Sequence, residues 1–118
     1  MDTLHYLDFT AEYGGIPPFP IKELKEGTYA YKLKITRKQR DQLLRYISKI
    51  DRPDKFHETV VRLYLKFDNE EIFITCHGRV KRGADEYLMD PQAFLRLAYY
   101  MEMLKVKSGI KEGVPKFY

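Results

Sequence analysis

Hydrophobic and polar residues alternate along parts of this chain, as they do in a strand with one buried and one solvated face. Between residues 28 and 35, Tyr31, Leu33 and Ile35 fall on one side, and Lys32 and Lys34 fall on the other. The same period of two returns over residues 58–67 and again over residues 72–81. The pattern therefore predicts three strands, each with an apolar face and a polar face.

The second and third predicted strands are joined by Asp68-Asn69, two residues that tolerate a positive φ in a tight turn. A two-residue loop at this point predicts a hairpin in which every inward residue meets another inward residue. The inward pairs are Leu65 with Ile72, Leu63 with Ile74, and Val61 with Cys76.

Two helical patterns accompany the strands. Thr36 and Gln39 have the spacing of a capping box, and the apolar period continues until Arg52-Pro53, which predicts a helix over residues 37–50. Asp90 before Pro91 marks the start of a second helix, which we expect to end before Gly109. Each helix is expected to carry one apolar stripe: Leu43, Leu44, Ile47 and Ile50 in the first, and Phe94, Leu97, Ala98, Met101 and Leu104 in the second.

These elements define a fold class. A short apolar piece at residues 87–89 is compatible with an edge strand, so the order is β-α-β-β-(β)-α. This order indicates an α+β fold with a mostly antiparallel sheet of three to five strands. Because each helix has one stripe, both helices should cover the same face of the sheet in a two-layer sandwich, which leaves the other face open.

Neither end of the chain shows these periods. Residues 1–27 include the run Ile16-Pro17-Pro18-Phe19-Pro20, and an irregular segment is expected because proline fixes φ and removes a backbone donor. Residues 107–118 are polar with two glycines and Pro115, so an irregular tail is expected there. With 118 residues, the chain fits one domain over 1–118.

The open face of the predicted sheet is rich in basic and aromatic residues. In the predicted register Tyr64 lies opposite Phe73, Arg62 opposite Thr75, and Val60 opposite His77. Tyr and Arg are favoured in protein interfaces, so the face indicates a non-catalytic module that binds a protein partner or a second copy of the chain. The predicted binding face consists of Lys32, Lys34, Arg62, Tyr64, Lys66, Phe73, His77, Arg79 and Lys81.

Two other interpretations of this face stay open. Single-stranded nucleic acid, or another anionic ligand, fits because bases stack on rings while Lys and Arg neutralise phosphates. An ordinary solvated sheet face fits as well, because Lys, Arg, Thr and Tyr combine strand propensity with solubility.

A second basic cluster lies at the start of the first predicted helix. Arg37, Lys38 and Arg40 occupy a turn in which acids are usually preferred, because the helix dipole is positive there. An anion held by these bases, Thr36 and the free amides would offset the repulsion, although counterions would screen it too. Thr36, Arg37, Lys38 and Arg40 are therefore a predicted anion site.

Composition says more about where the protein is located in the cell than about its function. The net charge is +4, but residues 1–27 hold five acids and two bases, whereas the rest holds nineteen bases and twelve acids. No apolar run approaches the roughly 18 to 20 residues that span a bilayer, and acids stand where a secretory signal carries bases. A lone Cys76 cannot form an internal disulfide. We expect a cytoplasmic protein with no membrane partner.

Catalytic and metal sites have little support in the sequence. Neighbouring strand residues point to opposite faces, so Cys76, expected in the core, cannot form a nucleophile and base pair with His77. The three histidines lack metal-ligand spacing, and phosphate-loop, dinucleotide and hydrolase motifs do not occur. No metal or cofactor is expected. A small enzyme remains an alternative, with His77, Tyr64 and Arg62 as its candidate residues.

Overall fold

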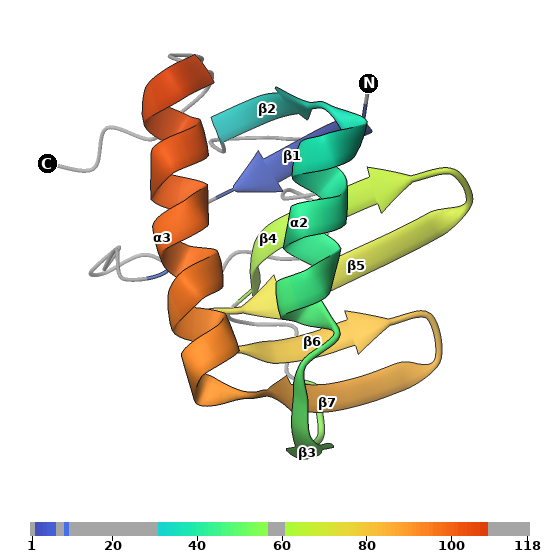
Figure 1. Ribbon diagram of the computed structural model, residues 1–118. Coiled ribbons are helices and arrows are strands. Elements are labelled where there is room, and N and C mark those ends of the chain that lie inside the picture. Colours follow the sequence, from blue (N-terminus) through green and yellow to red (C-terminus); the bar gives the residue numbers. More distant parts are fainter. Residues whose placement is uncertain (1, 7–8, 10–30, 57–60, 109–118) are drawn as a thin grey trace, which may run out of the picture.

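The computed structural model describes residues 2–6, 9, 31–56 and 61–108, and its elements are labelled in Figure 1. The strands are β1 Asp2–Tyr6, β2 Tyr31–Ile35, β3 Ile50–Pro53, β4 Val61–Phe67, β5 Glu70–Thr75, β6 Arg79–Arg82 and β7 Asp85–Met89. The helices are α2 Arg37–Ile47 and α3 Pro91–Ser108. The predictions for residues 7–8, 10–30, 57–60 and 109–118 lie outside the described residues.

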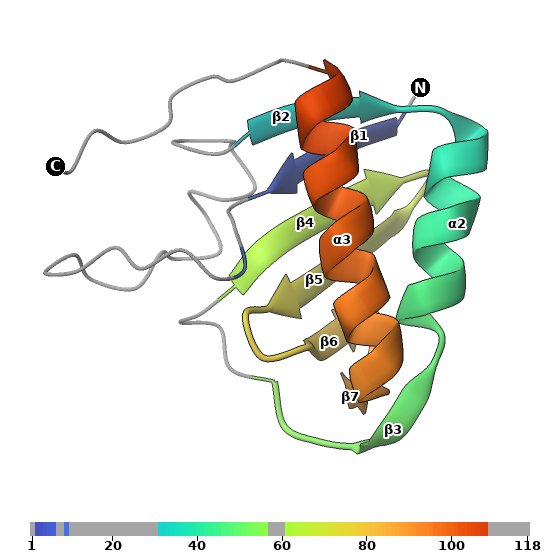
Figure 2. The same cartoon turned by 60° about the vertical axis from the view of Figure 1, so that its left-hand side comes forward.

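The described strands form one antiparallel sheet with the order β2-β1-β4-β5-β6-β7-β3. Both helices pack side by side on the same face of this sheet, as the two views in Figures 1 and 2 show. The predicted α+β class is therefore confirmed. The predicted number of three to five strands is wrong, because the sheet has seven strands, and the predicted element order differs accordingly.

Two strands were not predicted. β1 lies inside the segment expected to be irregular, where Leu4 and Tyr6 are buried between β2 and β4. β3 lies where the first helix was expected to continue to residue 50, but α2 ends at Ile47. All four residues of β3 are exposed, so this strand has no hydrophobic alternation that a sequence pattern could reveal.

The hairpin of β4 and β5 has the predicted turn and most of the predicted register. Asp68 has a φ of 50°, and Leu65 pairs with Ile72. The pairs Leu63 with Ile74 and Tyr64 with Phe73 also form. The register then shifts between Val61 and Leu63, so Val61 pairs with Thr75. The predicted pairs of Val61 with Cys76 and Arg62 with Thr75 are therefore wrong.

A turn at residues 76–78 divides the third predicted strand into β5 and β6. Gly78 has a φ of 81°, and a Cβ atom there would lie 3.1 Å from the Phe94 ring. The Thr75 hydroxyl accepts hydrogen bonds from the backbone N–H groups of His77 and Arg79. Cys76 is consequently half-buried in a turn, and His77 is exposed in that turn, so neither has the strand position that we predicted.

The core lies between the helices and the inner face of the sheet. Its buried residues include Leu33 and Leu65 from the sheet, and Leu43, Leu97 and Met101 from the helices. Two buried tyrosines also link the layers: the Tyr6 hydroxyl donates to Glu102 on α3, and the Tyr87 hydroxyl donates to the Ile47 carbonyl of α2. Neither described helix is long and apolar enough to cross a membrane.

The expectation of one apolar stripe per helix is wrong for α3. Besides the residues that face the core, this helix has a second apolar row on its solvent side. Leu95 is 51% exposed, Tyr99 71%, Met103 42% and Val106 78%. We call these four residues the outer row of α3.

Candidate binding surface

The strand register places the centre of the predicted binding face in one row across the sheet. Starting at the β2 edge, Lys32 lies beside His5, His5 beside Tyr64, Tyr64 beside Phe73, and Phe73 beside Lys81. Neighbours in such a row lie on the same face, about 5 Å apart. The structure therefore brings four of the predicted face residues together and adds His5, which sequence reasoning did not include.

The aromatic centre of this row is buried within the single chain. Tyr64 is 5% exposed and Phe73 is 8% exposed. Their ring centroids lie 5.1 Å apart, with His5 at 5.7 Å from Tyr64 and Phe56 at 6.4 Å from Phe73. The face that we predicted to be open is therefore closed at Tyr64 and Phe73. These rings cannot serve as a stacking platform unless their neighbours move.

The Tyr64 hydroxyl is also occupied. It donates a hydrogen bond of 2.5 Å to the Glu71 carboxylate on β5. Burial raises the pKa of Tyr64 above its ordinary value, and the hydrogen bond and negative charge of Glu71 raise it further. Tyr64 thus remains a neutral donor at physiological pH, which fixes Glu71 on the outer face.

On the β6 side of the face, acids accompany the bases. The Arg79 Nε atom lies 3.2 Å from the Asp54 carboxylate. The Lys55 backbone N–H and the positive charge of Arg79 lower the pKa of Asp54, against the opposing effect of burial. Lys81 pairs with Glu86 in the register of β6 and β7. Arg79 therefore adds little net charge to the surface. Lys81 has an acid opposite it in the register, as Lys66 does, but it is half-buried whereas Lys66 is exposed.

On the β2 side, two lysines are exposed. Lys34 on β2 and Lys66 on β4 flank Thr3 of β1 in the register, and all three residues are exposed. Lys66 also lies opposite Glu71. In the part of the chain that the structure describes, neither lysine side chain forms an ion pair or a hydrogen bond. Two strand spacings, about 10 Å, separate them.

Arg62 and His77 are peripheral to the row. Arg62 lies at the register shift of β4, is half-buried and donates to the Val61 carbonyl at 3.3 Å. His77 is exposed in the turn between β5 and β6. His77, Tyr64 and Arg62, the candidate catalytic residues, line neither of the two cavities described below.

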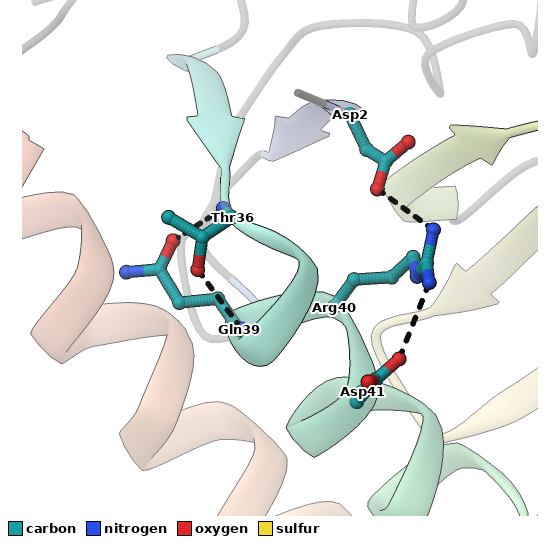
Figure 3. A network of polar contacts seen from close by, with 5 residues as sticks. All are labelled: Asp2, Thr36, Gln39, Arg40 and Asp41. Carbon is teal, nitrogen blue, oxygen red and sulfur yellow. Dashed lines mark hydrogen bonds and ion pairs between the residues drawn. The ribbon is translucent and has the colours of Figure 1, made fainter.

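At the start of α2, the predicted capping box is present, as Figure 3 shows. The Thr36 hydroxyl accepts from the Gln39 backbone N–H at 3.1 Å, and the Gln39 side chain accepts from the Thr36 N–H at 2.8 Å. Two of the donors that an anion could have used are thereby bound within the chain. The first turn holds no acid.

Arg40 does not point to a free anion site. Its guanidinium lies 3.2 Å from Asp2 of β1 and 3.4 Å from Asp41, as Figure 3 also shows. The same group lies 5.0 Å from the centroid of the Phe67 ring. Among the residues of the predicted anion site, Arg37 and Lys38 are exposed and form no ion pair within the described part of the chain.

Cavities occur on the helix layer. A groove of 720 Å³ lies between α2 and α3, and its lining includes Thr36, Arg45, Tyr46 and Tyr100. A hollow of 260 Å³ lies beside α3 next to Tyr99. No lining residue of either cavity lies on the outer face of the sheet. Within the described ranges, no group of three His, Cys, Asp or Glu residues is arranged to hold a metal ion.

Comparison with family models, curated proteins and solved structures finds no match to this chain. The function must therefore be inferred from the surface itself. Sequence reasoning found the lysines of the outer face through their alternation. It missed the outer row of α3, although the spacing of Leu95, Tyr99, Met103 and Val106 follows the helical period.

Proposed function

We propose that this protein is a non-catalytic binding module that contacts an acidic surface of a protein partner. Its contact residues are Lys34, Lys66, Arg37 and Lys38, which we call the basic strip. One observation carries the proposal: these four cations are exposed and form no ion pair among the described residues, whereas Arg40, Arg79 and Arg82 each have at least one carboxylate partner. Exposed, unpaired bases attract acidic groups, because their charge is not already neutralised by a carboxylate of the same chain.

The burial of the rings favours an acidic protein over single-stranded nucleic acid. Non-specific binding of single strands relies on bases stacking on exposed aromatic rings, at about 1–3 kcal/mol per base. Tyr64 and Phe73 are already buried within the chain. A partner is then held mainly by charge, so its binding should depend steeply on salt.

A titration with two labelled probes tests this proposal. A peptide of twenty glutamates and a single strand of twenty thymidines are compared by fluorescence anisotropy at 20 and 150 mM NaCl. We expect the acidic peptide to bind at low salt and to weaken at least tenfold at the higher salt. The oligonucleotide should bind no more tightly than the peptide. No binding of the peptide at 20 mM NaCl, or much tighter binding of the oligonucleotide, would contradict the proposal.

A charge-matched pair of variants locates the surface. Lys34→Glu with Lys66→Glu reverses two charges of the basic strip, and Lys49→Glu with Lys55→Glu reverses two exposed charges elsewhere. The first variant should lose at least tenfold in affinity for the peptide at 20 mM NaCl, and the second should lose less than threefold. Equal losses would show that overall charge, and not the basic strip, holds the peptide.

A further inference from the structure

The solvent side of α3 carries a hydrophobic surface that does not pack against the sheet. Val106 lies eleven residues after Leu95, so the outer row extends for about 16 Å along the helix axis. Its members follow one another by four, four and three positions, so they lie above one another on one face. Isolated exposed hydrophobic residues are common, but a continuous row along a helix is typical of an interaction surface.

The residues around Tyr99 are arranged symmetrically along the helix. Arg96 lies three positions before Tyr99, and Glu102 lies three positions after it. Leu95 and Met103 lie four positions before and after it. If a second α3 packs antiparallel with a two-fold axis near Tyr99, Arg96 meets Glu102 of the other copy, and Leu95 meets Met103 of the other copy. The contact is therefore self-complementary in charge and in hydrophobicity, as an isologous interface requires.

The charges at these positions are suited to such a contact. Arg96 is exposed and forms no ion pair among the described residues. Glu102 is held in place, since one of its oxygens accepts from the Tyr6 hydroxyl at 3.1 Å and the other lies 2.9 Å from the Lys105 amine. A carboxylate has about four acceptor positions, so Glu102 can bind a further guanidinium.

The hollow beside α3 matches the contact in shape. Its lining includes Leu95, Ala98, Tyr99 and Glu102, which have the spacing i, i+3, i+4 and i+7. Four residues of this kind form the hole that receives a side chain in knobs-into-holes packing. Tyr6 and Phe9 complete its lining. The centre of the hole lies within one residue of Tyr99, so the two-fold axis places Tyr99 of each copy over the hole of the other.

We propose that the chain forms a homodimer in which the α3 helices pair antiparallel, with the outer row buried and two Arg96–Glu102 ion pairs across the axis. This surface is separate from the basic strip and does not depend on it. One helix pair of this length buries less area than a standard interface of about 1,600 Å². The association should therefore be weak, with a dissociation constant of roughly 10–100 µM.

Charge exchange between two variants tests the pairing. Arg96→Glu puts two glutamates against each other across the axis, and Glu102→Arg does the same with two arginines. Each variant should sediment as a monomer at concentrations where the natural sequence is at least half dimeric. A mixture of the two restores both opposite-charge contacts, so it should give a heterodimer with an affinity within tenfold of the natural dimer.

The matched control is Arg52→Glu, which makes the same charge change at an exposed residue of β3, outside the outer row of α3, and should dimerise like the natural sequence. Sedimentation equilibrium between 10 and 500 µM measures all five samples, which are the natural protein, the three variants and the mixture, and circular dichroism verifies that each variant is folded. If Glu102→Arg folds poorly after losing the Tyr6 contact, Tyr99→Lys replaces it. Tyr99→Lys changes a 71% exposed side chain and should raise the dissociation constant of the dimer at least tenfold.

Three results would overturn the proposal. The first is a natural protein that is monomeric at 500 µM. The second is a dimer that Arg96→Glu and Tyr99→Lys leave intact, because another surface would then hold it. The third is a mixture of two well-folded charge variants that stays monomeric, because the antiparallel register would then be wrong.

Discussion

The outer face of the sheet and the solvent side of α3 differ in how far their aromatic residues are exposed to solvent. On the sheet, Tyr64 and Phe73 are buried within the chain beside neighbouring rings, and the Tyr64 hydroxyl is bound to Glu71. On α3, Tyr99 and its apolar neighbours are exposed. The difference shows that an aromatic residue on the side away from the core does not by itself mark a binding surface. What matters is whether the chain already covers it.

The largest expected effect is the difference in unfolding free energy between a ring removed from the sheet face and a ring removed from α3. Phe73→Ala should lower the free energy of unfolding by about 3 kcal/mol, because it removes a buried ring and leaves a cavity. Tyr99→Ala should lower it by less than about 0.5 kcal/mol in dilute solution, because the ring is exposed in the monomer. Urea unfolding at a few micromolar measures both. Similar losses for the two variants would remove the distinction between the surfaces.

A smaller effect concerns the Tyr64 hydroxyl. Tyr64→Phe should cost about 1 kcal/mol at pH 8, because Glu71 loses its hydrogen-bond donor. Tyr99→Phe, on the exposed side of α3, should change stability by less than about 0.3 kcal/mol at the same pH. Urea unfolding of both variants at pH 8 measures the difference.

The same variant has a pH dependence with a definite sign. The pKa of Tyr64 is raised in the folded chain, so its stabilising contribution is complete below pH 10 and declines as the pH rises beyond that value. At pH 10.5 the advantage of the natural sequence over Tyr64→Phe should be smaller by roughly 0.8 kcal/mol. An advantage that grows with pH would contradict the buried, neutral state of this hydroxyl.

The smallest effect compares the two sides of the sheet face. Lys81→Glu places a like charge opposite Glu86 and should cost about 0.5 kcal/mol. Lys34→Glu lies opposite the neutral Thr3 and should cost less. The difference between the two variants, measured by urea unfolding at 20 mM NaCl, should shrink at 500 mM NaCl because salt screens exposed charges. A larger cost for Lys34→Glu would show that the charges are distributed differently from our description.

The predictable part of the fold is that in which one face of an element is buried. Alternation identified the inward residues of β2, β4 and β5, and the Asp68-Asn69 turn set the register near Tyr64. β3 could not be predicted because all its residues are exposed. β1 has only two buried apolar positions on its inward side, Leu4 and Tyr6, before the described strand ends. Such a short pattern gives no reliable period.

The turn at residues 76–78 was missed for a geometric reason. When a three-residue turn joins two antiparallel strands, the residue before the turn lies opposite the residue after it. These two residues are four positions apart, so odd-numbered residues stay on the same face through the turn. Thr75 and Arg79 therefore share a side, and the alternation runs through the turn without a break. Only Gly78, with its positive φ, distinguishes this turn from a continuous strand. The same reason explains why His77 was assigned to the sheet face.

The sequence predicted which charged residues lie on the candidate surfaces, but not which of their side chains are buried or paired in the fold. The sequence identified Lys34 and Lys66 as outward residues, and it identified Arg40 as a base at the start of a helix. It could not show that Asp2, some forty residues earlier in the chain, lies beside Arg40, because that contact depends on the unpredicted position of β1. The proximity of Phe56 to Phe73 is likewise a tertiary contact without a local signal.

The position of β1 between β2 and β4 has a consequence for how the chain folds. The strands β4 to β7 follow one another as a meander and can pair locally as they are synthesised. β1 leaves the ribosome first, yet its pairing with β4 joins Leu4 to Leu65, about 60 residues later. A nascent chain can therefore form only the β1–β2 pair at first, and this hairpin must wait for β4 before it joins the sheet. Among the strand pairs of the sheet, β1–β4 therefore joins residues that lie furthest apart in the sequence, and its closure carries the largest loop-closure cost.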